Sequence, residues 1–298
     1  MVKRKPLILL LIGAFSSAIF LSCSQSNKQD ENKSNQDHLE PNNSLNTIFD
    51  GKIFSIPSPI QTAYLIKQLD LPFDESLLIN ASNAAQIGTE NKQALILGMY
   101  GTDIGYAALY DQKSITLNYL SSIEKLINKL GLDAAFDVNT LAYFNGKHQQ
   151  DSLILLMSDA YRKTDNILKS ADRKATSALI LTGGWIESLN IACQLDEVHL
   201  NPEIKRRIGE QKPTLNSVIE ILKEYNIEEK NTELIDELEL LKESFDQVEI
   251  KYEYAAAETD AATTLTTFNH KLDIVIDKSV LEEIRSKVAH IRSEIIKV

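Results

Sequence analysis

The sequence predicts an all-α fold, a multi-helix bundle or helical array with at most one short strand. Apolar residues recur at helical spacing through most of the chain after residue 48. Residues that favour helix starts and stops separate these segments, and the breaks between them are short, as compact helical domains require. We therefore expect helix to follow helix along the body of the protein.

In the N-terminal part, residues 46–59 form an entry segment that Pro57-Ser58-Pro59 interrupts. Ser58 is placed to cap a helix over 59–69, since a Ser hydroxyl accepts a hydrogen bond from the first helical turn. Asp74 can cap a short helix that runs to about residue 82 in the same way. A long, almost wholly apolar helix is predicted over 89–110.

The next helix, 113–130, is amphipathic and Gly131 ends it. Its apolar residues at helical spacing are Leu117, Leu120, Ile123, Ile127 and Leu130. Further helices are predicted over 151–170, 172–195, 202–209, 214–225, 233–258 and 279–297. Residues 271–276 alternate between polar and apolar side chains, which predicts a short strand or an extended crossover.

The helix over 89–110 contains the most informative residue of the chain. One face carries only small residues, which let another backbone approach closely: Ala94, Gly98, Gly101, Gly105 and Ala108. Because a helix that is apolar all round is buried, Asp103 on the opposite face is expected to be a buried carboxylate among tyrosines. Such a group is costly unless it is hydrogen-bonded or paired.

The helix over 172–195 repeats part of this pattern. Residues 94–97 and 178–181 both read Ala-Leu-Ile-Leu, and six residues after each run lies an acid, Asp103 and Glu187. An old duplication of a helical unit would explain the match and would place two similar helices at the centre of one bundle. The alternative is coincidence, because Ala and Leu are common residues.

The N-terminus has the three parts of an export signal: basic Lys3, Arg4 and Lys5, an apolar run over 7–21, and the small residue Ser22. The run is shorter than the ~20 residues that a transmembrane helix needs. We expect residues 1–22 to be a signal peptide, with an ordinary secreted protein or an uncleaved anchor as alternatives.

Residues 23–47 are predicted to be Cys23, which ends a lipobox-like motif, followed by a disordered tether. Ser, Asn, Gln, Asp and Lys dominate this segment, which therefore buries too little apolar surface to fold. As a flexible coil it reaches on the order of 25–30 Å from a membrane. The body is then residues 48–298, with 48–197 and 198–298 as alternative sub-units.

Composition limits the partners of the protein. The formal net charge is −11, and removal of the basic leader makes it more negative, so we expect no nucleic-acid partner. The chain has two cysteines. If Cys23 carries acyl chains such as palmitate, Cys193 is left alone and no intramolecular disulfide can form.

Several segments together resemble a family of uncharacterised helical lipoproteins of the Bacteroidetes. The lipobox-like Phe20-Leu21-Ser22-Cys23 has Phe20 where the usual pattern has Leu, and acidic Asp30-Glu31 resembles the surface-export signals of such proteins. The body segments are Ile56-Pro57-Ser58-Pro59, ALILGMYGTDIGYAALYDQ (94–112), the helix from Tyr119 to Gly131, and GGWIE (183–187). The resemblance covers roughly residues 54–195 and implies diacylation of Cys23 and location in the envelope, but no activity.

Known catalytic layouts are mostly missing. We find no phosphate loop, dinucleotide fingerprint, nucleophile elbow or zinc-protease motif. Two acids and the aromatic residues near them in the sequence remain as candidate ligand-binding residues: Tyr100, Asp103, Tyr106, Tyr110, Trp185 and Glu187. They could bind a cationic or polyhydroxylated ligand. The structural alternative is that each acid accepts hydrogen bonds from Tyr hydroxyls, helix N-termini or a buried arginine such as Arg162 or Arg173.

The sequence therefore predicts an outer-membrane lipoprotein of the cell envelope, on the periplasmic or the exposed side, with a non-enzymatic binding or structural role. Its partners are the membrane, through the lipid anchor, and a small molecule or a protein; no cofactor or metal is expected. A hydrolase or metal-dependent enzyme that uses Asp103 and Glu187 is the alternative. A third hypothesis is an assembly role for the acidic helices over 214–258.

Overall fold

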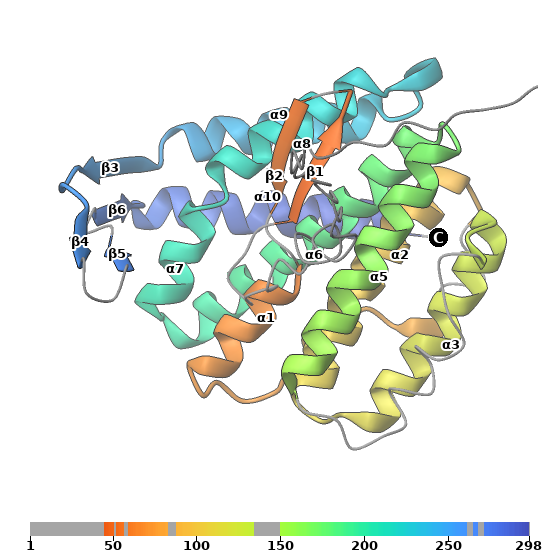
Figure 1. The fold of residues 1–298 in the computed structure, drawn as a ribbon, viewed down its shortest axis with the longest axis horizontal. Helices are drawn as coiled ribbons and strands as arrows, with labels where there is room; N and C mark the ends of the chain where they lie inside the picture. The colour runs from red at the N-terminus through yellow and green to blue at the C-terminus, as the bar shows by residue number, and fades with distance from the viewer. Residues whose placement is uncertain are drawn as a thin grey trace, which may run out of the picture. The chain divides into compact units, whose positions relative to one another are not determined.

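The computed structural model describes residues 45–50, 52–56, 59–82, 88–133, 150–260, 265–267 and 271–297 (Figure 1). The leader, Cys23, the tether up to residue 44, and Ser58 lie outside these residues. The all-α prediction is confirmed: helices form most of the described chain, and Leu39–Val298 is one compact unit. Along the described residues, no helix has both the length and the hydropathy of a membrane span.

Two central helices, α2 (Glu90–Leu109) and α6 (Lys174–His199), pack tightly against each other and are buried along most of their length. Their backbones meet at glycines. A Cβ atom on Gly98 would overlap the carbonyl oxygen of Ile180, and one on Gly183 would overlap that of Leu95. The close approach that the small-residue face predicts is therefore confirmed, and the two helices of the suspected duplication are neighbours.

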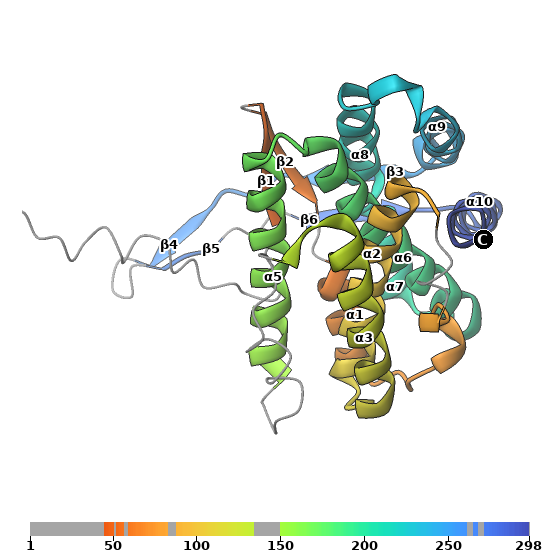
Figure 2. The ribbon, with the colours of Figure 1, turned by 90° about the vertical axis from the view of Figure 1, so that its right-hand side faces the viewer.

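Other helices surround this pair, and Figure 2 shows α5 and α10 on opposite sides of it. Those that contact α2, α6 or both are α1 (Pro59–Gln68), α3 (Lys113–Leu130), α5 (Gln150–Ser170), α7 (Pro202–Gly209), α8 (Lys212–Glu224) and α10 (Lys278–Ile296). Helix α9 (Thr232–Asp246) packs on α8 and α10. Gly131 ends α3 with a left-handed φ of 64°, as expected, but Leu117 of α3 is exposed rather than buried.

Residues 71–82, which we call the strap, join α1 to the loop before α2 and lie across the central helices. Asp74 acts as the predicted cap: its Oδ1 accepts a hydrogen bond of 2.9 Å from the Ser76 nitrogen. The helix that follows is only one 3-10 turn, Glu75–Leu77, rather than a helix to residue 82. The strap does not form a continuous helix, and side chains of neighbouring helices bind its backbone groups, as described below.

Strands are more numerous than expected, and each pairs with one partner. The entry segment is a hairpin of β1 (Leu45–Phe49) and β2 (Lys52–Ile56). The predicted strand over 271–276 is confirmed as β6 (Lys271–Val275), antiparallel to β3 (Glu249–Glu253), and β4 (Glu258–Asp260) pairs with β5 (Leu265–Thr267).

The predicted helix over 233–258 was too long, because it ends at Asp246. The residues that follow alternate strictly between apolar and charged side chains, from Val248 through Ile250 and Tyr252. This period of two is that of a strand and is incompatible with one helix face.

Candidate functional site

The two predicted acids meet where α2 crosses α6. Asp103 and Glu187 are both completely buried. Helix α10 supplies Arg292, whose Nε and Nη2 donate to the two carboxylate oxygens of Glu187 over 2.7 and 2.8 Å. A bidentate pair of this kind is what a buried carboxylate needs to offset its desolvation. We call Asp103 and Glu187 the carboxyl pair.

We infer that the carboxyl pair carries one proton. The pKa of Asp103 is raised well above its ordinary value by burial and by the charge of Glu187, although the Ile79 N–H and the charge of Arg292 oppose the increase. Burial also raises the pKa of Glu187, although the hydrogen bond and charge of Arg292 and a hydrogen bond with Asp103 lower it. Since one guanidinium neutralises one carboxylate, we place the proton on Asp103. Its Oδ1 is buried and receives no hydrogen bond from the described residues, as expected of the protonated oxygen.

Side chains around the carboxyl pair bind the backbone of the strap. The Ile79 nitrogen donates to Asp103 Oδ2 over 3.1 Å, and Arg292 Nη2 donates to the Leu77 carbonyl over 3.0 Å. From α3, the Tyr119 hydroxyl donates to the Ile79 carbonyl. Buried backbone groups need such partners, so the carboxyl pair and Arg292 fix the middle of the strap.

The predicted tyrosines of α2 also bind the strap. Tyr100 donates to the carbonyls of residues 80 and 81 over 3.1 and 3.3 Å, and Tyr110 donates to the carbonyl of residue 71 over 2.7 Å. The Tyr106 hydroxyl accepts from the nitrogen of residue 74 over 3.1 Å. Burial raises the pKa of Tyr106, so its hydroxyl stays neutral. Each of the three hydroxyls therefore has a partner within the protein.

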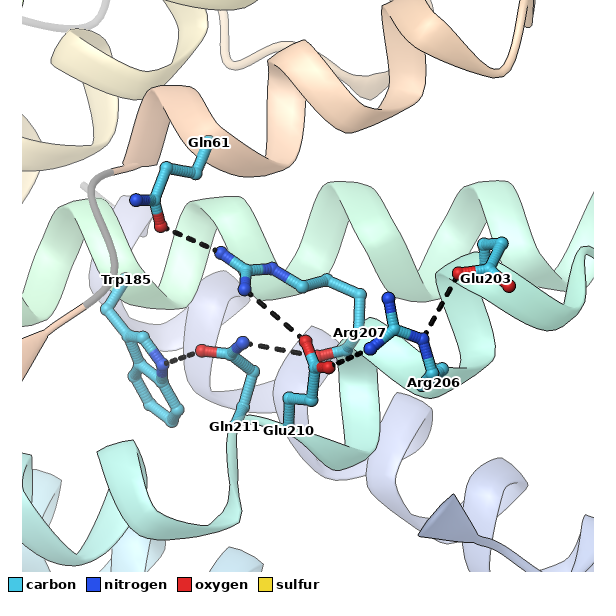
Figure 3. A network of polar contacts seen from close by, with 7 residues as sticks. All are labelled: Gln61, Trp185, Glu203, Arg206, Arg207, Glu210 and Gln211. Carbon is cyan, nitrogen blue, oxygen red and sulfur yellow. Dashed lines mark hydrogen bonds and ion pairs between the residues drawn. The ribbon is translucent and has the colours of Figure 1, made fainter. Parts of the chain in front are cut away.

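Trp185 lies apart from the carboxyl pair and belongs to another buried network (Figure 3). Its Nε1 donates to Gln211 Oε1 over 3.1 Å, and Gln211 Nε2 donates to the Arg207 carbonyl over 3.1 Å. Arg207 Nη2 reaches Gln61 of α1 over 3.1 Å. This network joins α1, α6 and the junction of α7 and α8, so Trp185 fixes helices there.

The predicted arginine partners of the buried acids are wrong. Arg162 is exposed and pairs with Asp159 over 2.6 Å, while Arg173 binds Glu90 and the Leu130 carbonyl. The actual partner, Arg292, lies 105 residues from Glu187 along the chain. A signal was present in the sequence, since Arg292 interrupts the apolar stripe of the last helix, between Ile291 and Ile295.

A pocket of about 580 Å³ opens between the strap and α3, next to the carboxyl pair but not in contact with it. Ile79 and Tyr119 lie between the two. The Ile79 nitrogen binds Asp103, the Tyr119 hydroxyl binds the Ile79 carbonyl, and both residues line the pocket. The strap contributes Glu75, Leu78, Ile79, Asn80, Ala81 and Ser82, and α3 contributes Ile115, Asn118, Tyr119, Ser121, Ser122 and Lys125. Of the side chains predicted to bind a ligand, Asp103 and Tyr100 thus support the strap wall of this pocket.

Comparisons with protein-family models, curated proteins and solved structures give no match to this chain. Within the described ranges, no three His, Cys, Asp or Glu side chains are grouped as they are around a metal ion. The chemistry of the site is therefore argued from its own residues.

The raised pKa of Asp103 predicts how stability changes with pH. The unfolded chain releases this proton near pH 4 and the native state retains it, so the free energy of unfolding falls as pH rises above about 4, by at most about 1.4 kcal/mol per pH unit. Asp103→Asn has no proton to release and keeps a hydrogen-bond donor for Glu187. Urea unfolding between pH 4 and 8 should show that wild type loses stability relative to this variant as pH rises.

The control for this experiment is Asp236→Asn, which changes an exposed carboxylate of α9. The plot of its free energy of unfolding against pH should run parallel to that of wild type. Parallel profiles for wild type and Asp103→Asn would mean that Asp103 is ionised in the native state over this range, and would contradict the shared proton.

Proposed function

We propose that this protein is a lipid-anchored envelope protein whose helical body binds a small, neutral, polyhydroxylated ligand without reacting with it. The pocket between the strap and α3 is the observation that carries the binding function. Its volume of about 580 Å³ is in the range of small-molecule sites. The strap that forms one wall is fixed by hydrogen bonds to α2, α3 and α10, so the pocket is formed before a ligand arrives.

The side chains of the pocket favour a neutral ligand with many hydroxyl groups. Amides and hydroxyls dominate the polar part of the lining: Asn80, Ser82, Asn118, Ser121 and Ser122. One acid and one base, Glu75 and Lys125, leave no net charge to select an ion. Leu78 and Ile115, which are both partly exposed, offer an apolar surface beside these polar groups. A mono- or disaccharide has this combination of surfaces.

The carboxyl pair favours binding over hydrolysis. Two carboxyl groups that cleave a glycoside must reach the substrate from opposite sides of the bond. Here both are fully buried, Arg292 occupies both oxygens of Glu187, and Ile79 and Tyr119 lie between the acids and the pocket. These groups serve to hold the strap.

The anchor is proposed from the leader, Cys23 and the tether, together with the resemblance to Bacteroidetes lipoproteins. Two acyl signals give stable membrane attachment, whereas one gives only marginal binding. A tether of this length would hold the pocket clear of the outer membrane on whichever side the protein is placed.

Removal of Cys23 tests the anchor. With an alkyne analogue of palmitate in the growth medium, the full chain expressed in a bacterium with lipoprotein processing should incorporate the label and sediment with membranes. Cys23→Ser should lose both properties, whereas Cys193→Ser should keep them. Equal labelling of wild type and Cys23→Ser would exclude acylation at this position.

Binding is tested by isothermal titration calorimetry of the full chain with glucose, N-acetylglucosamine and maltose. We expect saturable binding of at least one of them, weakened about tenfold by Asn118→Leu, a loss of roughly 1.4 kcal/mol. Asn128→Leu is the control, because Asn128 is also exposed on α3 but does not line the pocket. Absence of saturable binding, or equal effects of the two variants, would contradict the proposal.

A further inference from the structure

A second hollow, of about 260 Å³, lies between α6 and α10. Helix α6 contributes Asn190, Cys193, Gln194 and Glu197. Helix α10 contributes Glu282, Arg285, Ser286 and Ala289. Both sets follow the spacing of one helix face. The hollow begins one helical turn beyond the pair of Glu187 and Arg292, and it stays open because α10 carries only the small Ser286 and Ala289 in its next turn.

The inner wall of the hollow contains two buried donors. Asn190 is 1% exposed, and its Nδ2 has no acceptor among the residues that the structure describes. Nε of Arg285 is buried and, within the same residues, also without an acceptor, while an ion pair with buried Asp196 fixes the guanidinium through Nη2. Buried donors without acceptors cost stability. Both donors belong to side chains that line the hollow.

The mouth of the hollow is acidic, whereas its inner wall carries hydrogen-bond donors. Glu197 and Glu282 are both exposed and line the opening from the two helices. Two carboxylates repel a ligand of net negative charge and attract an ammonium group. The Cys193 thiol between the two ends is neutral, because burial raises its pKa to about 12, so it contributes an apolar wall rather than a nucleophile.

We propose that the hollow between α6 and α10 binds a free α-amino acid. The carboxylate accepts hydrogen bonds from Asn190 Nδ2 and Arg285 Nε on the inner wall, and the ammonium group lies between Glu197 and Glu282 at the mouth. A zwitterion has a carboxylate for the donors on the inner wall and an ammonium group for the acids at the mouth. A simple anion or a simple cation has only one of these groups. This site uses other helix faces than the strap pocket and is independent of the saccharide proposal.

The experiment titrates the full-length protein with each of the common L-amino acids and follows binding by calorimetry. Propionate and ethylamine serve as matched fragments of alanine, since the first lacks the ammonium group and the second lacks the carboxylate. We expect saturable binding of at least one amino acid and at least tenfold weaker binding of both fragments. If no amino acid binds, or if propionate binds as tightly as the best amino acid, the proposal is wrong.

Variants locate the site. Asn190→Ala and Glu282→Gln should each weaken amino-acid binding at least tenfold, and they leave the pair of Arg285 and Asp196 intact. Glu283→Gln is the matched control: it removes a neighbouring charge of α10 that pairs with Lys287 and lies outside the hollow. Asn118→Leu of the strap pocket should also leave amino-acid binding unchanged. Amino-acid binding that survives both Asn190→Ala and Glu282→Gln would place it elsewhere and overturn the assignment.

Discussion

The structure depends on one buried electrostatic arrangement, the carboxyl pair with Arg292. Two acids at the crossing of α2 and α6 cannot both be ionised in the absence of water, because burial and mutual repulsion penalise the second charge. The arrangement resolves this conflict with one guanidinium and one proton. Arg292 neutralises Glu187, and the raised pKa of Asp103 favours its protonated form, which can donate a hydrogen bond to Glu187. As a result, three helices that are distant in sequence are joined by charge-assisted hydrogen bonds at the centre of the core.

This arrangement also connects the core to both hollows. On one side, Asp103 and Arg292 hold the strap through the Ile79 nitrogen and the Leu77 carbonyl, and the strap forms one wall of the larger pocket. On the other side, the same faces of α6 and α10 continue into the smaller hollow. The tight packing of α2 on α6 leaves no space between them for a ligand, because their backbones touch at Gly98 and Gly183. The two hollows lie outside this contact, one between the strap and α3 and the other between α6 and α10.

Helical periodicity alone predicted most of the fold. The helices beginning at Pro59, Glu90, Lys113 and Pro202 follow from caps and apolar spacing, which are local properties of the chain. Burial of Asp103 also followed from a helix that is apolar all round. The role of these residues was not predictable in the same way, because the strap is held by contacts between distant segments and has no periodic signal. Arg292 and Tyr119 were missed for this reason, and β3 was missed because its alternation begins directly after a true helix.

The central claim is that the carboxyl pair holds the strap in place, and the amide of Ile79 reports on it most directly. This amide donates to the buried Asp103 and lies on the wall of the larger pocket. Native-state hydrogen exchange of the full chain, followed by nuclear magnetic resonance, measures the free energy at which this hydrogen bond opens. The account predicts that Ile79 exchanges as slowly as amides in the interior of α2. Exchange as fast as that of exposed loop amides would mean that the strap is not held by the carboxyl pair, and would contradict the account.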